Sequence, residues 1–111
     1  MALQEKQLGQ LRPANTTAAS IYSPGSGVTA IIRNITVTNV TNVATQFSLF
    51  HDDDGTTYDE TTALFFEVDI PKKTTVQITA FTAMNDASGN LAVKTETADA
   101  LNFTVYGAEA T

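Results

Sequence analysis

The segment HDDDGTTYDE, from His51 to Glu60, carries the residue types in this chain that are best suited to chemistry. It places the only histidine directly before three consecutive aspartates, and Asp59 and Glu60 follow closely. Carboxylate oxygens around a tight turn are the ligands that calcium prefers, and a histidine near a carboxylate can act in acid–base catalysis. The segment is therefore a metal site, an acid–base pair or a surface turn.

The spacing of the acids does not match an EF-hand calcium loop. Such a loop needs acids at positions 1, 3 and 5, a glycine at position 6 and a glutamate at position 12. With Gly55 at the sixth position, Phe50 falls at the first and Thr61 at the twelfth. An EF-hand is therefore excluded.

A looser calcium site remains open, with Asp52, Asp54 and Asp59 as its candidate ligands. The favoured interpretation is simpler. The dipeptide Asp54-Gly55 is a common turn signal between two strands, and the neighbouring acids would then be solvated.

His51 lacks the partners that catalysis or metal binding would need. The chain has no second histidine and no cysteine, so a zinc site would depend on one imidazole and carboxylates, which is unusual. Asp52 is adjacent, but neighbours on a strand point to opposite faces. We expect His51 to be a surface residue at a strand end, and we expect neither an enzyme nor a cofactor.

Composition limits the other function classes. The 111 residues suit one domain, and the absence of cysteine excludes disulfides and thiolate catalysis. The formal charge is -6, and the six basic residues are scattered, which argues against nucleic-acid binding. No apolar run is long enough for a membrane helix, and the start has no signal-peptide pattern. We expect a protein made in a cytoplasm, without a membrane partner.

Alternating apolar residues predict β-strands with one wet face. Turn-forming segments separate these runs, among them SPGSG at 23–27, DDDG at 52–55, PKK at 71–73 and NDASGN at 85–90. The pattern predicts a single antiparallel β-sandwich of seven or eight strands, or a small barrel. The expected inward sets are Ile31, Ile35 and Val37; Phe47 and Leu49; Leu64, Phe66, Val68 and Ile70; Thr74, Val76 and Ile78; Leu91 and Val93; and Leu101, Phe103 and Val105.

The first fifteen residues read differently from the rest. Polar residues surround three leucines, and Gly9 and Pro13 would break a helix. Two interpretations stand: a frayed terminus, or an extended arm that lies on a neighbouring subunit. The division is then an arm over 1–15 and a β-sandwich domain over 16–111. The arm's expected contact residues are Leu3, Leu8, Leu11 and Arg12.

Four aromatic residues fall where alternation does not clearly send them inward. They are Tyr22, Tyr58, Phe65 and Tyr106. Exposed aromatics on a β-sheet could stack on sugar rings or fill a protein interface. For Phe65, a place in the core between two sheets is an equal alternative.

Several segments together resemble a known family. LGQLRPANTT, SIYSPGSGVTAIIRNITVTN, VDIPKKTTVQI and ALNFTVYGAE are similar to segments of small β-sandwich virion proteins encoded by tailed bacteriophages. The shared features are a polar start, a strand ending in tyrosine, a Pro/Gly loop, a long apolar strand and a closing strand. The resemblance spans nearly the whole chain, and its motifs are structural rather than catalytic.

The resemblance implies a jelly-roll-like decoration or cement protein on the outside of a phage capsid. Its implied partners are the major capsid protein and further copies of itself, as a homotrimer. It would be made in the bacterial cytoplasm and located in the virion, where it would stabilise contacts between shell subunits. The alternative is a tail-associated module that binds a host glycan or receptor, and its motivation is the candidate exposed tyrosines and the loop from Asp52 to Asp59.

Overall fold

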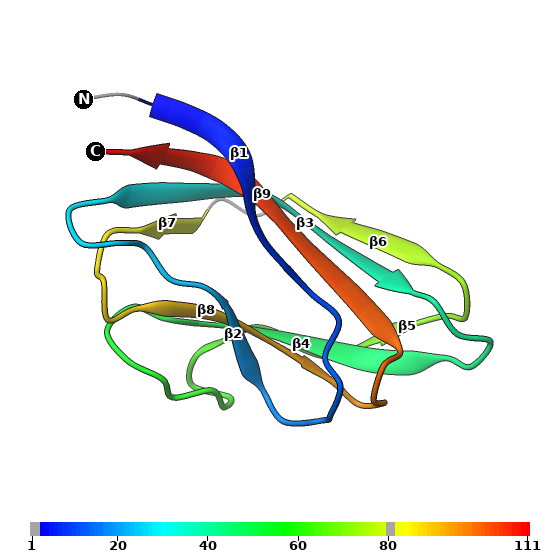
Figure 1. Cartoon of the computed structure of the whole chain (residues 1–111). Coiled ribbons are helices and arrows are strands. Elements are labelled where there is room, and N and C mark those ends of the chain that lie inside the picture. The colour runs from blue at the N-terminus through cyan, green and yellow to red at the C-terminus, as the bar shows by residue number, and fades with distance from the viewer. Residues whose placement is uncertain (1–2, 80–81) are drawn as a thin grey trace.

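Two antiparallel β-sheets pack face to face, as Figure 1 shows, and the computed structural model describes residues 3–79 and 82–111. In those residues the strands are β1 (Leu3–Leu11), β2 (Ala19–Tyr22), β3 (Thr29–Asn39), β4 (Thr45–Asp52), β5 (Ala63–Ile70), β6 (Thr75–Ile78), β7 (Thr82–Met84), β8 (Asn90–Thr95) and β9 (Leu101–Ala110). Sheet A has the order β1-β9-β3-β6, with β7 also paired to β3. Sheet B has the order β2-β8-β4-β5.

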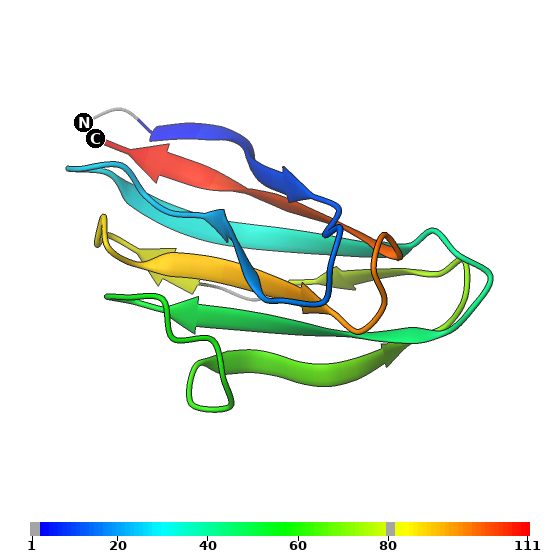
Figure 2. The ribbon, with the colours of Figure 1, turned by 60° about the horizontal axis from the view of Figure 1, so that its bottom comes forward.

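This order confirms the predicted all-β, jelly-roll-like sandwich. The chain moves repeatedly between the sheets, so strands adjacent in space are mostly distant in sequence, as in double Greek-key folds (Figure 2). The expected number of strands was too low, because neither β1 nor β7, which has three residues, was predicted as a strand. The molecule is elongated, with extents of 45 × 26 × 21 Å.

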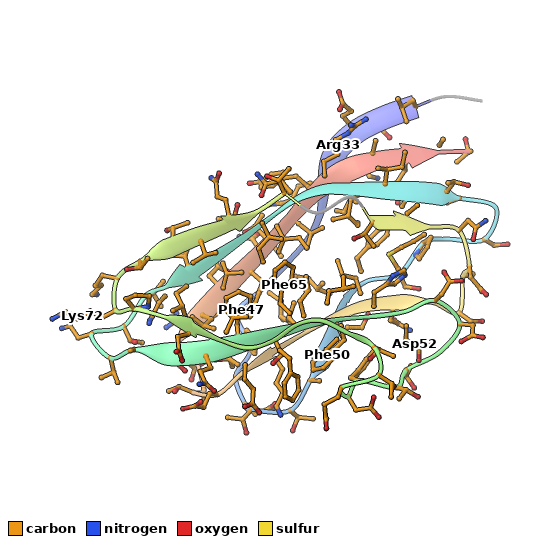
Figure 3. The ribbon with its side chains drawn as sticks, turned by 180° about the vertical axis from the view of Figure 1, so that it is seen from behind. Arg33, Phe47, Phe50, Asp52, Phe65 and Lys72 are labelled. Atoms are coloured by element: carbon orange, nitrogen blue, oxygen red, sulfur yellow. The ribbon has the colours of Figure 1, made fainter. Side chains whose placement is uncertain are left out.

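The core fills the space between the sheets. Phe47 of sheet B and Phe103 of sheet A meet edge to face, with ring centroids 6.4 Å apart. Figure 3 shows Phe47 and Phe65 directed between the sheets. Burying a large apolar side chain contributes about 1.5–3 kcal/mol, so this layer is the main source of stability. Its largest fully buried members are Ile32, Ile35, Val37, Phe47, Leu49, Ile70, Met84, Leu91, Val93, Leu101 and Phe103.

A bulge in β3 changes which isoleucine faces the core. Ile32 pairs with Gly107 and Asn34 with Tyr106, so Arg33 is an extra residue without a partner on β9. One extra residue reverses the alternation. The prediction of Ile31 as an inward residue was therefore wrong: Ile32 is buried before the bulge, whereas Ile35 and Val37 are buried after it.

A second bulge has the same effect in β5. Leu49 pairs with Phe65 and Phe47 pairs with Val68, which leaves two residues of β5 opposite Ser48. The expectation that Leu64 and Phe66 face inward with Val68 was wrong, since they are 44% and 43% exposed. The remaining inward sets agree with the structure in β4, β6, β8 and β9.

The first strand corrects the prediction of an arm over residues 1–15. Residues 3–11 form β1, which pairs antiparallel with β9 at the edge of sheet A; Met1 and Ala2 lie outside the described residues. The mostly polar sequence of β1 gave no strong strand signal, because an edge strand with little burial gains its stability from pairing. β1 is therefore part of the sandwich.

Candidate functional site

The acidic loop is organised by its own side chains. The Asp52 carboxylate accepts hydrogen bonds from the backbone N–H groups of Thr57, at 2.8 Å, and Asp54, at 3.3 Å. The Thr57 bond is the main cause that lowers the pKa of Asp52. Asp59 accepts from the backbone and hydroxyl of Thr61, which lowers the pKa of Asp59. These contacts are typical of Asx turns.

The predicted calcium ligands are not gathered around one point. Among residues 3–79 and 82–111, no group of three or more histidine, aspartate or glutamate side chains is placed to hold a metal ion. Asp52 and Asp59 instead satisfy backbone donors on separate turns. The favoured interpretation of this segment as a turn agrees with this geometry.

His51 is less exposed than expected. It follows Phe47 and Leu49 on the inward side of β4, so its side chain is only 17% exposed. Its Nε2 lies 3.9 Å from the Asp53 carboxylate and has no hydrogen-bond partner among the described residues. It borders a hollow of about 360 Å³ with Thr29, Met84 and Asn85. His51 does lie at a strand end, and its side chain is half-buried.

Only one of the four ambiguous aromatics is exposed. Tyr22 belongs to the core, and Phe65 packs against it, which confirms the alternative interpretation of Phe65. The Tyr58 ring covers Phe50 at 6.2 Å on the outer side of sheet B. Tyr106 is 45% exposed. Of the three tyrosines, Tyr106 therefore has the most exposed ring.

The predicted arm residues lie on the sandwich and differ in their surroundings. Leu8 and Leu11 pack against the core. Leu3 is 61% exposed. Arg12 donates from Nε to the carbonyl oxygen of Asp99 at 2.9 Å. Of these four residues, Leu3 offers the apolar surface that a partner could cover.

A partly buried carboxylate joins the two sheets near the chain ends. Glu109 of β9 accepts a hydrogen bond from the hydroxyl of Tyr22 in β2, and Lys6 of β1 lies 2.7 Å from its other oxygen. The pKa of Glu109 is lowered, chiefly by Lys6 and then by Tyr22. Burial and the neighbouring carboxylate raise the pKa of Tyr22. This contact fixes β1 to both layers.

One end of the sandwich presents apolar and basic side chains together, a feature that the sequence analysis missed. We call the set Val40, Val43, Lys72 and Lys73 the Val43 end. It lies on the β3–β4 loop and the β5–β6 turn, and Figure 3 shows Lys72 at the end opposite Asp52. Val40 is 38% and Val43 is 69% exposed. Valines inside the turn segment NVTNV were the available signal.

Asn39 holds the Val43 end in one shape. Its buried side chain donates to the carbonyl oxygens of Val43, Ile70 and Pro71 at 2.9, 3.3 and 3.1 Å. Its Oδ1 accepts from the backbone N–H and hydroxyl of Thr41. Since Val43 precedes β4 and Ile70 ends β5, one side chain connects the two loops.

Lys73 adds two further links across the same end. Its backbone N–H donates to the Thr41 carbonyl at 3.1 Å, and its ammonium donates to the Val40 carbonyl at 3.2 Å. Its φ of 52° is the left-handed value that a tight turn requires. The exposed valines are therefore presented by a preorganised backbone.

A polar hollow of about 240 Å³ lies on the outer face of sheet B. Ser48, which is buried, lies opposite Lys94 of the neighbouring strand β8. The β5 bulge lies on the other side of Ser48, because β5 pairs with β4 on the edge opposite β8. The hollow is lined by Thr16, Gln46, Ser48, Glu67, Lys94, Thr95 and Glu96.

Comparison of the chain with protein-family models, with curated proteins and with solved structures finds no match. In the part of the chain that the structure describes, no helix has the length and apolar character needed to cross a bilayer.

Proposed function

We propose that this protein is a structural virion protein of a tailed bacteriophage, which binds the outside of the capsid and stabilises contacts between shell subunits. The observation that carries the proposal is the Val43 end, where exposed valines and two lysines lie on loops fixed by Asn39. The resemblance of the sequence to small phage virion proteins supports the same function.

The chemistry of the Val43 end suits a protein partner. A preorganised loop loses little conformational entropy on binding, so more of the contact energy remains as affinity. Val40 and Val43 supply apolar area, and Lys72 adds positive charge on a chain of net charge -6. The matching surface on the major capsid protein is an apolar depression with acidic residues at its rim. Such charge pairs increase the association rate and make it sensitive to salt.

Many repeated binding sites on a capsid can compensate for the low affinity of a single small contact. A shell offers the same surface many times, and several linked binding ends engage it more strongly than one. Homotrimeric assembly, the state we propose, would supply three Val43 ends related by rotation. Sedimentation of the purified protein tests this state, and a monomer at all concentrations would exclude it.

Binding to particles tests the function. Capsids that lack the protein are mixed with the wild type, with Val43→Asp and with Leu3→Asp, which changes a similarly exposed residue of β1. We expect the wild type to bind at a copy number comparable with the shell protein. Val43→Asp should weaken binding at least about tenfold, and Leu3→Asp should not.

The outcomes distinguish whether the protein binds capsids from which of its surfaces makes the contact. If the wild type does not bind capsids, the proposed function is wrong. If the wild type and Val43→Asp bind equally while Leu3→Asp does not bind, the function stands and the contact surface is β1. Quantitative mass spectrometry of purified virions gives the copy number independently, and a handful of copies would favour the tail.

A tail-associated glycan- or receptor-binding module is the second candidate function. The hollow on sheet B is the specific observation that favours it.

A further inference from the structure

The hollow on sheet B owes its shape to the bulge in β5. Phe66 and Glu67 lie between the inward-facing Phe65 and Val68, and both are exposed. The bulge thus directs two consecutive side chains outward, where regular alternation would direct one. Glu67 lines the hollow, and Phe66 precedes it on the same strand.

Glu67 adopts a conformation that few side chains favour. Its φ is 50°, in the left-handed region. The Ser48 hydroxyl accepts the backbone N–H of Glu67 at 2.9 Å, which holds the bulge against β4. Such strain costs about 1–3 kcal/mol and is concentrated at ligand-binding and catalytic sites.

Groups able to bind a ligand converge around Ser48. Lys94 and Glu67 face the hollow from strands on either side of β4, and neither forms an ion pair within 4.0 Å among the described residues. Gln46 donates from Nε2 to Asp69 at 2.9 Å, which leaves its amide oxygen to accept a hydrogen bond. The hollow thus presents a cationic donor and several acceptors.

From this geometry we infer that the outer face of sheet B binds one residue of a neutral carbohydrate, with the hydroxyl groups in the hollow and one apolar ring face against Phe66. Carboxylate, amide and ammonium groups accept from and donate to sugar hydroxyls. Phe66 is 43% exposed and offers an apolar ring face. The inference does not depend on capsid binding.

Size and charge favour a small neutral ligand. The volume of about 240 Å³ is below the roughly 300 Å³ at which pockets for drug-sized ligands begin, so it suits a single sugar ring. Two glutamates against one lysine disfavour an anion. Among the described residues no metal-binding group is present, so binding should not require a divalent cation.

Titrations with glucose, galactose, mannose and N-acetylglucosamine test the inference, followed by amide NMR spectra of the labelled protein. We expect at least one sugar to shift the Gln46, Ser48, Glu67 and Lys94 signals saturably, with a millimolar Kd that EDTA does not change. Phe66→Ala should weaken this binding roughly tenfold. Glu67→Gln, which keeps the side-chain size, should weaken it several-fold.

Tyr106→Ala is the matched control, because Tyr106 is a similarly exposed aromatic, at 45%, on sheet A. It should leave the affinity unchanged. The inference is overturned if none of the four sugars produces a saturable shift at these residues, or if Phe66→Ala and Tyr106→Ala bind as tightly as the wild type. Retained capsid binding by Phe66→Ala would separate this site from the Val43 end.

Discussion

Replacement of Asn39 by alanine should destabilise the protein and loosen the Val43 end. The side chain is 1% exposed and bonds the carbonyl oxygens of Val43, Ile70 and Pro71. Alanine cannot replace any of these bonds. The loops on either side of the end would then lose their common link.

The expected loss follows from the surroundings of each bond. The bond to the Ile70 carbonyl is buried, and an acceptor left unpaired in the interior costs about 1–3 kcal/mol. The other bonds are only partly buried, so water can replace them and each contributes near the lower limit of about 0.5 kcal/mol. The sum is about 3–5 kcal/mol, or a fall in Tm of roughly 12–20 °C at about 4 °C per kcal/mol.

Urea and thermal unfolding measure this loss. Asn102→Ala is the control, since Asn102 is a half-buried asparagine on β9 and should cost less than about 1 kcal/mol. Asn39→Asp replaces the donor by a second acceptor facing three carbonyl oxygens, so it should be at least as destabilising as Asn39→Ala. A stable Asn39→Asp variant, or a loss for Asn39→Ala equal to that of Asn102→Ala, would refute the reasoning.

Four further outcomes are expected. Because the pKa of Glu109 is lowered, its carboxylate stabilises the fold above its ordinary pKa of 4.5, and this stabilisation is lost as pH falls below that value. Urea unfolding at pH values from 7 to 3 should therefore show a shrinking difference in the free energy of unfolding between the wild type and Glu109→Gln. Gly107→Ala should lower Tm strongly, because its Cβ would clash with the backbone oxygen of Ile31 in β3, whereas Gly25→Ala should not. Millimolar calcium should leave Tm unchanged, and an increase would restore the acidic loop as a metal site. Glu67→Gly should raise Tm slightly by relieving the left-handed backbone, yet weaken sugar binding; equal binding would contradict the proposed role of Glu67.

Much of the architecture could be predicted from the sequence. Phe47 and Leu49, and later Leu101, Phe103 and Val105, alternate without interruption, and all five are buried. A period of two needs no knowledge of the partner strand. β1 could not be predicted in this way, because its membership of sheet A depends on pairing with β9, almost a hundred residues later.

The residues of the candidate sites were missed for a different reason. Nothing in the letters FFEV marks a bulge, because the extra residue is fixed by Ser48 on another strand. Alternation read through the bulge assigns Phe66 to the core, whereas the structure exposes it. The Val43 end was missed similarly, since the role of Asn39 depends on carbonyl groups that the fold brings from the end of β5.

The β5 bulge departs from two rules that favour stability. A large aromatic at the surface and a strained glutamate beside it reduce stability, and a sequence shaped only for folding would place glycine in the bulge and a polar residue before it. In β5 the strained Glu67 lines the hollow, and the exposed Phe66 directly precedes it. In the β3 bulge, by contrast, the outward residue is Arg33, a charged residue paired with Glu5 at 3.2 Å, which surface exposure alone explains. Both bulges insert one extra outward-facing residue into a strand. Because only the β5 bulge carries an exposed aromatic residue and a strained glutamate, sheet B is the place to look for a ligand.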